Sequence, residues 1–193
     1  MRRLELIVLL VLATVYTFFV QYPNVNQNTR YDLTRAIVED GVLYIDRFHE
    51  NTVDKSYANG HWYTDKAPGL SFLAVPVYAA LSALQPVADP AVWLGYPLHV
   101  LNAATVAFPG ALLVLLVLKW TRRATGDDAA ALAAAAILGL GTLVLPFATL
   151  FFGHVTSALF SFAAFYALWQ LRHDGDQAAR EPLLMLGAGL LAG

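Results

Sequence analysis

Residues able to do chemistry crowd into the stretch Gly-His-Trp-Tyr-Thr-Asp-Lys-Ala-Pro-Gly at positions 60–69. Asp65 and Lys66 stand directly before Ala67-Pro68-Gly69, and proline suits the first turn of a helix because its missing N–H group is not needed there. A helix N-terminus carries free N–H groups and a partial positive charge, which favour anions such as phosphate. Lys66 adds a positive point charge. We therefore predict a phosphate-binding corner at Asp65 and Lys66.

The composition indicates that this corner lies at a membrane. The chain has 193 residues, of which 58% are hydrophobic and only 13% charged, whereas charged residues make up about a quarter of a soluble domain. The net charge of −2 gives no basic field for nucleic acid, and the lack of cysteine excludes disulfides and thiol chemistry. We predict an all-α polytopic membrane protein, a transmembrane helix bundle with a large outer loop after the first helix and an interfacial helix.

Apolar runs and turn residues give the boundaries of these elements. The predicted order is a transmembrane helix over 4–22, the outer loop over 23–67, the interfacial helix over 68–85, transmembrane helices over 93–118, 128–151 and 155–171, and the start of a further one over 183–193. The last run is too short to cross a membrane, since a helix needs about 20 residues. We therefore expect the chain to be the N-terminal part of one longer transmembrane domain.

The side of the membrane follows from basic residues. Arg2 and Arg3 place the N-terminus in the cytoplasm, because positive charge favours the inner side. The basic loops at 119–123 and 172–180 fall on that same side only if the helix over 68–85 lies at the interface instead of crossing. Its polar residues Ser71, Tyr78, Ser82 and Gln85 form one stripe, which is typical of an interfacial helix. The chemistry therefore collects on the outer face of a cell (inner or plasma) membrane.

Local signals predict some structure within the outer loop. Thr29–Asp40 has a helical pattern, with capping-box spacing of Thr29 and Asp32 and a terminating Gly41. Residues 42–48 are β-prone, and Asn59-Gly60 predicts a tight turn.

The motifs Asn28-Thr29-Arg30-Tyr31, after the first apolar run, and Tyr63-Thr64-Asp65-Lys66-Ala67-Pro68-Gly69, at the start of the second, carry a resemblance. The layout resembles the N-terminal part of the C-type membrane glycosyltransferases. That family includes protein O-mannosyltransferases, lipid A aminoarabinose transferases and bacterial enzymes that decorate lipopolysaccharide or cell-wall glycans. The resemblance implies an enzyme that moves a sugar from a polyprenyl-phosphate donor to a lipid, glycan or protein acceptor outside the membrane.

The resemblance also implies roles for single residues. Lys66 matches the lysine that contacts the donor phosphate, and Arg30 and Tyr31 match an Arg-Tyr pair, so these three are the predicted donor-binding residues. Gln27 and Asn28 stand where the family has an acidic pair, and amides cannot act as general bases.

The predicted catalytic residues are therefore Asp65, which matches the acidic neighbour of the lysine, and His154, on the predicted outer turn. Histidine exchanges protons near neutral pH. The loop carboxylates Asp46, Glu50 and Asp54 are the fallback bases, whereas Asp32 is the predicted capping acid.

Other interpretations of these residues stay open. Lys66 could snorkel from the membrane edge, and Asp65 could form a local cap or salt bridge. His49, Glu50, Asp54 and His61 match no metal motif, so we predict solvated loop residues, with no certain cofactor and a divalent metal left open. The alternative function is a non-catalytic subunit that binds lipid-linked sugar or serves assembly, as the amides at 27 and 28 favour. A transporter is less favoured because the sequence shows no internal repeat.

Overall fold

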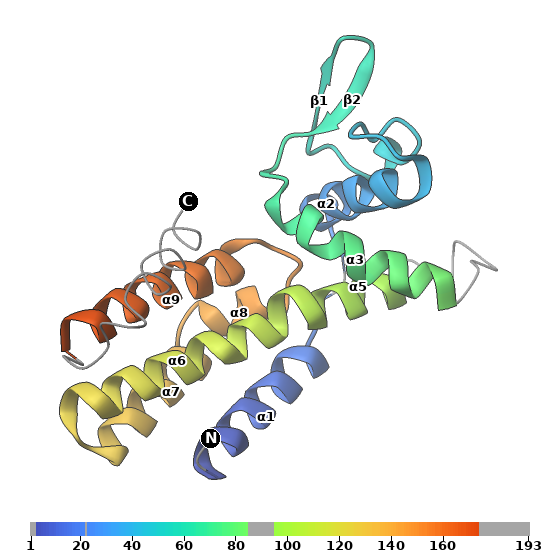
Figure 1. The fold of residues 1–193 in the computed structure, drawn as a ribbon. Coiled ribbons are helices and arrows are strands. Elements are labelled where there is room, and N and C mark those ends of the chain that lie inside the picture. The colour runs from blue at the N-terminus through green and yellow to red at the C-terminus, as the bar shows by residue number, and fades with distance from the viewer. Residues whose placement is uncertain (1–2, 22, 85–94, 174–193) are drawn as a thin grey trace.

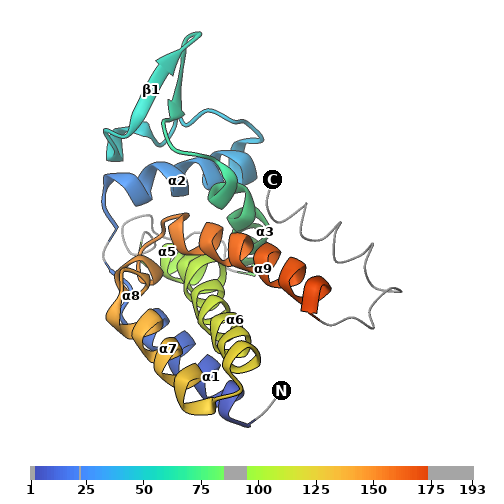
Figure 2. The ribbon, with the colours of Figure 1, turned by 90° about the vertical axis from the view of Figure 1, so that its left-hand side faces the viewer.

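The structure is a computed structural model and describes residues 3–21, 23–84 and 95–173 (Figure 1). It has two parts. One is an elongated group of helices, and the other is a smaller unit of two helices and a hairpin at one end of it (Figure 1). Figure 2 shows the hairpin at one end of the molecule, with the start of α1 and the end of α6 at the other.

The elongated group contains most of the helices. They are α1 (Arg3–Phe18), α5 (Gly95–Asn102), the π-helical turn η3 (Ala103–Ala107), α6 (Phe108–Thr125), α7 (Asp128–Gly141), α8 (Val144–Ala148) and α9 (His154–His173). The helix α6 packs against α1, α7 and α9. Tyr16 of α1 is fully buried and donates its hydroxyl hydrogen bond to the carbonyl oxygen of Gly139 on α7, at 2.8 Å. Small residues at Gly110 and Gly139 let this ring lie between the helices, since a Cβ at either position would meet it at 3.1 to 3.4 Å.

The prediction of a polytopic transmembrane bundle is wrong. Among the described residues only one helix, Pro97–Thr125, is long and apolar enough to cross a membrane. The helices α1 and α3 have 16 residues and α7 has 14, fewer than the roughly 20 that a bilayer core requires.

Local breaks and polar residues explain why the other predicted spans are too short or too polar to cross a membrane. The predicted span over 128–151 is broken at Thr142, whose backbone is extended and whose hydroxyl donates to the carbonyl of Leu138 and accepts from the amide of Val144. The helix α9 has 20 residues, but it mixes polar side chains such as Thr156 and Gln170 with its apolar ones. The predicted start of a helix over 183–193 lies outside the described residues.

The smaller unit begins with α2 (Val25–Arg35), which continues as the π-helical η1 (Ala36–Asp40). The Asn24 side chain caps its start by accepting from the amide of Asn26. Gly41 ends the helix at φ 69, as predicted. The predicted capping box is wrong, because the helix starts before Thr29, and Thr29 and Asp32 are fully buried inside it.

A hairpin follows the 3-10 turn η2 (His49–Asn51). Strands β1 (Lys55–Ala58) and β2 (His61–Thr64) pair antiparallel. Asn59 and Gly60 have φ 52 and 87, the left-handed conformations that this tight turn needs, which confirms the prediction. Residues 42–48, predicted as β-prone, form bends and a turn instead. There the Asp46 side chain accepts the hydrogen bond from the backbone N–H of Trp62, at 2.6 Å, in place of a neighbouring strand.

The helix α3 (Gly69–Leu84) packs on α2 with its polar stripe toward α2. The Ser71 hydroxyl donates to the carbonyl oxygen of Arg30 at 2.9 Å, and the Tyr78 hydroxyl donates to the Glu39 carboxylate at 2.6 Å. Contacts within the protein therefore account for two residues of the stripe that suggested an interfacial helix, Ser71 and Tyr78. Gln85 lies outside the described residues. The interfacial position of α3 stays a prediction.

Candidate functional site

A pocket of about 600 Å³ lies where α2, α3 and α9 meet. Its lining includes the polar side chains of Arg30 and His154 and the apolar side chains of Phe72 and Leu73 on α3 and Phe160 on α9. The remaining lining residues are Ala67, Gly69, Leu70, Gly153, Thr156 and Ser157. The pocket therefore suits a ligand with one anionic or polar end and one apolar end.

Two helix N-termini open on this pocket. Lining residues Ala67 and Gly69 belong to the start of α3, and Gly153 and His154 belong to the start of α9. The first N–H groups of a helix have no acceptor within the helix, and its dipole places partial positive charge there. Two such ends beside one pocket favour an anion, above all phosphate.

Arg30 supplies a full positive charge at the same place. Contacts from α3 and from its own helix fix its backbone, since the Ser71 and Thr34 hydroxyls both donate to its carbonyl oxygen. Its guanidinium donates to the backbone and side-chain oxygens of Asn26 and lies 5.4 Å from the centre of the Phe152 ring. Its Nε is buried and has no hydrogen-bond partner, and Arg30 forms no ion pair with any residue that the structure describes.

The charge of Arg30 is only partly compensated. Burial lowers the pKa of Arg30 below its ordinary value, and the carboxylates of Asp54 and Asp65 act in the opposite direction. A half-buried cation with an unused donor and no counter-ion in contact is stabilised by an added anion.

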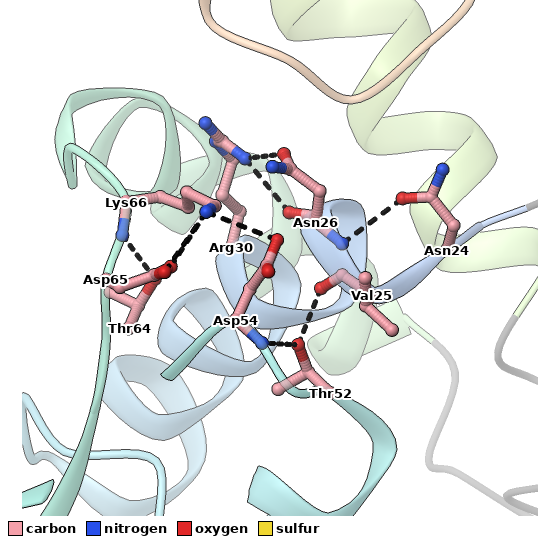
Figure 3. A network of polar contacts seen from close by, with 9 residues as sticks. All are labelled: Asn24, Val25, Asn26, Arg30, Thr52, Asp54, Thr64, Asp65 and Lys66. Atoms are coloured by element: carbon pink, nitrogen blue, oxygen red, sulfur yellow. Dashed lines mark hydrogen bonds and ion pairs between the residues drawn. The ribbon is translucent and has the colours of Figure 1, made fainter. Parts of the chain in front are cut away.

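Lys66 lies in a cluster with two carboxylates next to Arg30 (Figure 3). Its ammonium is 3.0 Å from Asp65 and 3.2 Å from Asp54. The hydrogen bond to Asp65 raises the pKa of Lys66 above its ordinary value; burial opposes this shift, and Asp54 adds to it. Because two carboxylates neutralise Lys66 and it does not line the pocket, Arg30 is the better placed cation. The role of Lys66 at the donor phosphate stays a prediction.

The structure separates Tyr31 from the other predicted site residues. Tyr31 is buried, and its ring packs edge to face against that of Tyr78 with centroids 5.6 Å apart. It does not line the pocket, so its observed contacts are those of the α2–α3 core. His154 does line the pocket, is exposed, and lies against the edges of the Phe147 and Phe152 rings.

The amides at the position of the expected acidic pair tie α2 to two other segments of the chain. Gln27 is buried and accepts a hydrogen bond from the backbone N–H of Phe151 at 3.0 Å. The Asn28 side chain donates to the carbonyl oxygen of Asn51 at 2.9 Å. Both amides therefore have structural partners. Gln27 connects α2 to the segment before α9, and Asn28 connects α2 to η2.

Asp32, predicted from the sequence to be a capping acid, is a buried acid inside α2. It is fully buried, accepts from the Asn51 side chain with one carboxylate oxygen, and leaves its other oxygen without a partner. Burial raises the pKa of Asp32 to about 7, although Asn51, Arg35 and Lys55 act to lower it. The sequence named Asp54 only as a fallback base. In the structure its carboxylate contacts Lys66, in the cluster next to Arg30.

The loop histidines have other partners. His61 pairs with Asp46 at 2.6 Å, and His49 stacks on the Trp62 ring. Within residues 3–21, 23–84 and 95–173 no three His, Cys, Asp or Glu side chains form a group that could hold a metal ion.

Comparison of the chain with protein-family models, with curated proteins and with solved structures finds no match. The resemblance to the C-type glycosyltransferases therefore stays a prediction.

Proposed function

We propose that the chain belongs to a membrane-associated glycosyltransferase that moves a sugar from a polyprenyl-phosphate donor to a lipid, glycan or protein acceptor on the outer face of the cell membrane. One observation carries the proposal. The pocket between α2, α3 and α9 joins an anion-binding end, made of Arg30 and two helix N-termini, to walls of Phe72, Leu73 and Phe160. A polyprenyl-phosphate sugar has the same two parts, a charged phosphate and an apolar chain.

Membrane association has separate support. The helix Pro97–Thr125 has 29 residues and a mean hydropathy of 2.2 in its most apolar window, which meets the length that a bilayer core requires. Apolar side chains are also exposed on α1, among them Ile7, Leu10 and Val11. The helix α9, which lines the pocket, packs against α6 of this long apolar helix.

In the proposed reaction the donor phosphate binds between Arg30 and the starts of α3 and α9. The acceptor hydroxyl oxygen attacks C1 of the sugar, the bond from C1 to the phosphate oxygen breaks, and its electron pair leaves with the lipid phosphate. Arg30 and the helix N-termini stabilise the negative charge that grows on that phosphate, a stabilisation that preorganised groups supply well. The acceptor proton passes to a carboxylate, Asp54 or Asp65, or to His154. A single displacement of this kind inverts the configuration at C1.

Transfer of labelled sugar tests the proposal. Membranes carrying the protein in its complete natural length are incubated with polyprenyl-phosphate donors of several sugars, and labelled acceptor is counted. Arg30→Gln and Lys66→Met are expected to lower transfer by at least about tenfold, since removal of one charge-stabilising donor commonly costs 10²–10³ in rate. Arg47→Gln is the control, because its exposed guanidinium pairs with Glu39 and Asp40 outside the pocket. Sugar transfer that persists in Arg30→Gln would show that the donor phosphate does not bind in this pocket.

The second candidate is a non-catalytic subunit that binds a lipid-linked sugar. The tethering roles of Gln27 and Asn28 favour it, because no carboxylate occupies the positions of the acidic pair. If the protein is such a subunit, the donor binds to it only when Arg30 is present, and the donor is recovered chemically unchanged. Consumption of the donor by the wild-type protein, but not by Asp54→Asn or Asp65→Asn, would instead support the enzyme.

A further inference from the structure

The two helices whose starts open on the pocket, α3 and α9, carry a hydroxyl residue at the same position. The first intrahelical hydrogen bonds come from the amides of Phe72 in α3 and Ser157 in α9. The residue directly before each of them is Ser71 in α3 and Thr156 in α9. The backbone N–H of that residue is the last one that has no acceptor within its own helix.

Both hydroxyls bond to another helix instead of to their own. Ser71 and Thr156 are buried. Ser71 donates to the backbone carbonyl of Arg30 in α2 at 2.9 Å, and Thr156 donates to that of Thr105 in η3 at 2.6 Å. A hydroxyl inside a helix often bonds to the carbonyl four residues earlier, as that of Thr125 does in α6. Here each hydroxyl connects the start of its helix to a neighbouring helix.

The long apolar helix is built to receive the bond from Thr156. In a regular α-helix the carbonyl of Thr105 accepts from the N–H at position 109, but that residue is Pro109, which has no N–H. The next residue is Gly110, where a methyl group would lie 3.0 Å from the side chain of Val155. Glycine therefore lets the start of α9 pack closely on α6, and proline takes away the regular partner of the carbonyl that Thr156 contacts.

We propose that Ser71 and Thr156 are positioning residues of the pocket, which hold the starts of α3 and α9 so that their free N–H groups act on one phosphate. The inference rests on the proposed function. Thr156 itself lines the pocket, and Ser71 follows two lining residues and holds the backbone of Arg30, the cation of the pocket. Donors that are fixed before a charged group binds stabilise it better than donors that must be ordered.

Titration calorimetry with two ligands that share one apolar chain tests this inference. The protein in its complete natural length, in neutral detergent, is titrated with geranyl phosphate and, separately, with geraniol, which lacks the phosphate. Thr156→Val and Ser71→Ala are each expected to weaken the binding of geranyl phosphate about tenfold, since one hydrogen bond to a charged group corresponds to roughly tenfold or more in affinity. The affinity for geraniol is expected to stay unchanged, because the apolar walls are intact.

Conservative variants separate positioning from general loss of stability. Thr156→Ser keeps the hydroxyl and is expected to bind geranyl phosphate as the wild type does. Thr125→Val is the matched control, because it removes an exposed hydroxyl at the end of α6 and is expected to keep the affinity. An equal loss of affinity for geranyl phosphate and geraniol in Thr156→Val, or a loss that Thr156→Ser does not restore, would overturn the inference.

Arg30→Gln distinguishes failure of this inference from failure of the proposed function. If Arg30→Gln binds geranyl phosphate more weakly while Ser71→Ala and Thr156→Val bind it as the wild type does, the positioning role is wrong and the phosphate site stands. If the wild type binds geranyl phosphate no better than geraniol, and Arg30→Gln changes neither affinity, the pocket is not a phosphate site. That outcome would overturn the donor site of the proposed function and this inference with it.

Discussion

The buried carboxyl of Asp32 makes a pH-dependent prediction whose size follows from the structure. The pKa of Asp32 rises from an ordinary value of 3.8 to about 7 in the folded protein, chiefly because burial disfavours the charged form. Between these values the folded state binds one proton more than the unfolded state, so stability falls as the pH rises. The slope is about 1.4 kcal/mol per pH unit, which gives on the order of 3 kcal/mol between pH 5 and pH 7.

Asp32→Asn removes this titration. We expect the free energy of unfolding of the variant to change less with pH, so that its stability relative to wild type improves by up to about 3 kcal/mol from pH 5 to pH 7. Urea unfolding in detergent, followed by tryptophan fluorescence at pH 5, 6, 7 and 8, measures the difference.

Glu39→Gln is the matched control, because it makes the same change of carboxyl to amide. Burial acts to raise the pKa of Glu39, but hydrogen bonds from Arg35 and Tyr78 outweigh it and lower the pKa below its ordinary value. Its contribution is therefore present throughout pH 5–8 and is lost only in more acidic solution. A stability difference between wild type and Asp32→Asn that stays constant across pH 5–8 would refute the reasoning about Asp32.

Three further predictions concern stability and use the same unfolding measurement. Gly139→Ala is expected to lower the free energy of unfolding by about 1–3 kcal/mol, because its new methyl group would lie 3.1 Å from the Tyr16 hydroxyl. Gly141→Ala is the control and is expected to keep the stability of the wild type, because a methyl group there meets no other part of the protein within 4 Å. Gln27→Leu is expected to cost about 1–3 kcal/mol, since the amide of Phe151 loses its acceptor; a neutral result would contradict the tether. Tyr78→Phe is expected to cost about 1.5–3 kcal/mol through its bond to Glu39, whereas Tyr57→Phe, 62% exposed, is expected to change stability little.

Signals within a few residues of one another predicted local structure well. Asn59-Gly60 gave a tight turn because both residues tolerate a left-handed backbone. Pro68-Gly69 predicted the start of α3, whose first turn is closed by the amide of Phe72 bonding to the carbonyl of Pro68. Such features depend on the residues at the turn itself, so the sequence contains them.

Contacts between distant segments explain what the sequence did not predict. The backbone carbonyl of Arg30 accepts a hydrogen bond from Ser71, 41 positions away. The side chain of Gln27 accepts one from the backbone of Phe151, 124 positions away. Hydropathy counted apolar residues over 128–151 but gave no sign of the break at Thr142, where a side chain satisfies the backbone. The apolar walls of the pocket, Phe72 and Phe160, come from two distant segments, and nothing in either sequence indicates that these rings line one pocket.

The contacts of Lys66 link two parts of the proposed reaction, the binding of the donor phosphate and the release of a carboxylate that can act as the base. In the free protein its ammonium holds both Asp54 and Asp65, so neither carboxylate is available as a base while that cluster is intact. A donor phosphate that binds at Arg30 brings a competing anion close to Lys66, and a lysine that turns toward it releases a carboxylate. A carboxylate that is freed from Lys66 can accept a hydrogen bond from the acceptor hydroxyl, as a general base must. In the proposed reaction, donor binding and release of the base are therefore one event, and the base is a carboxylate at position 54 or 65 instead of one at position 27 or 28.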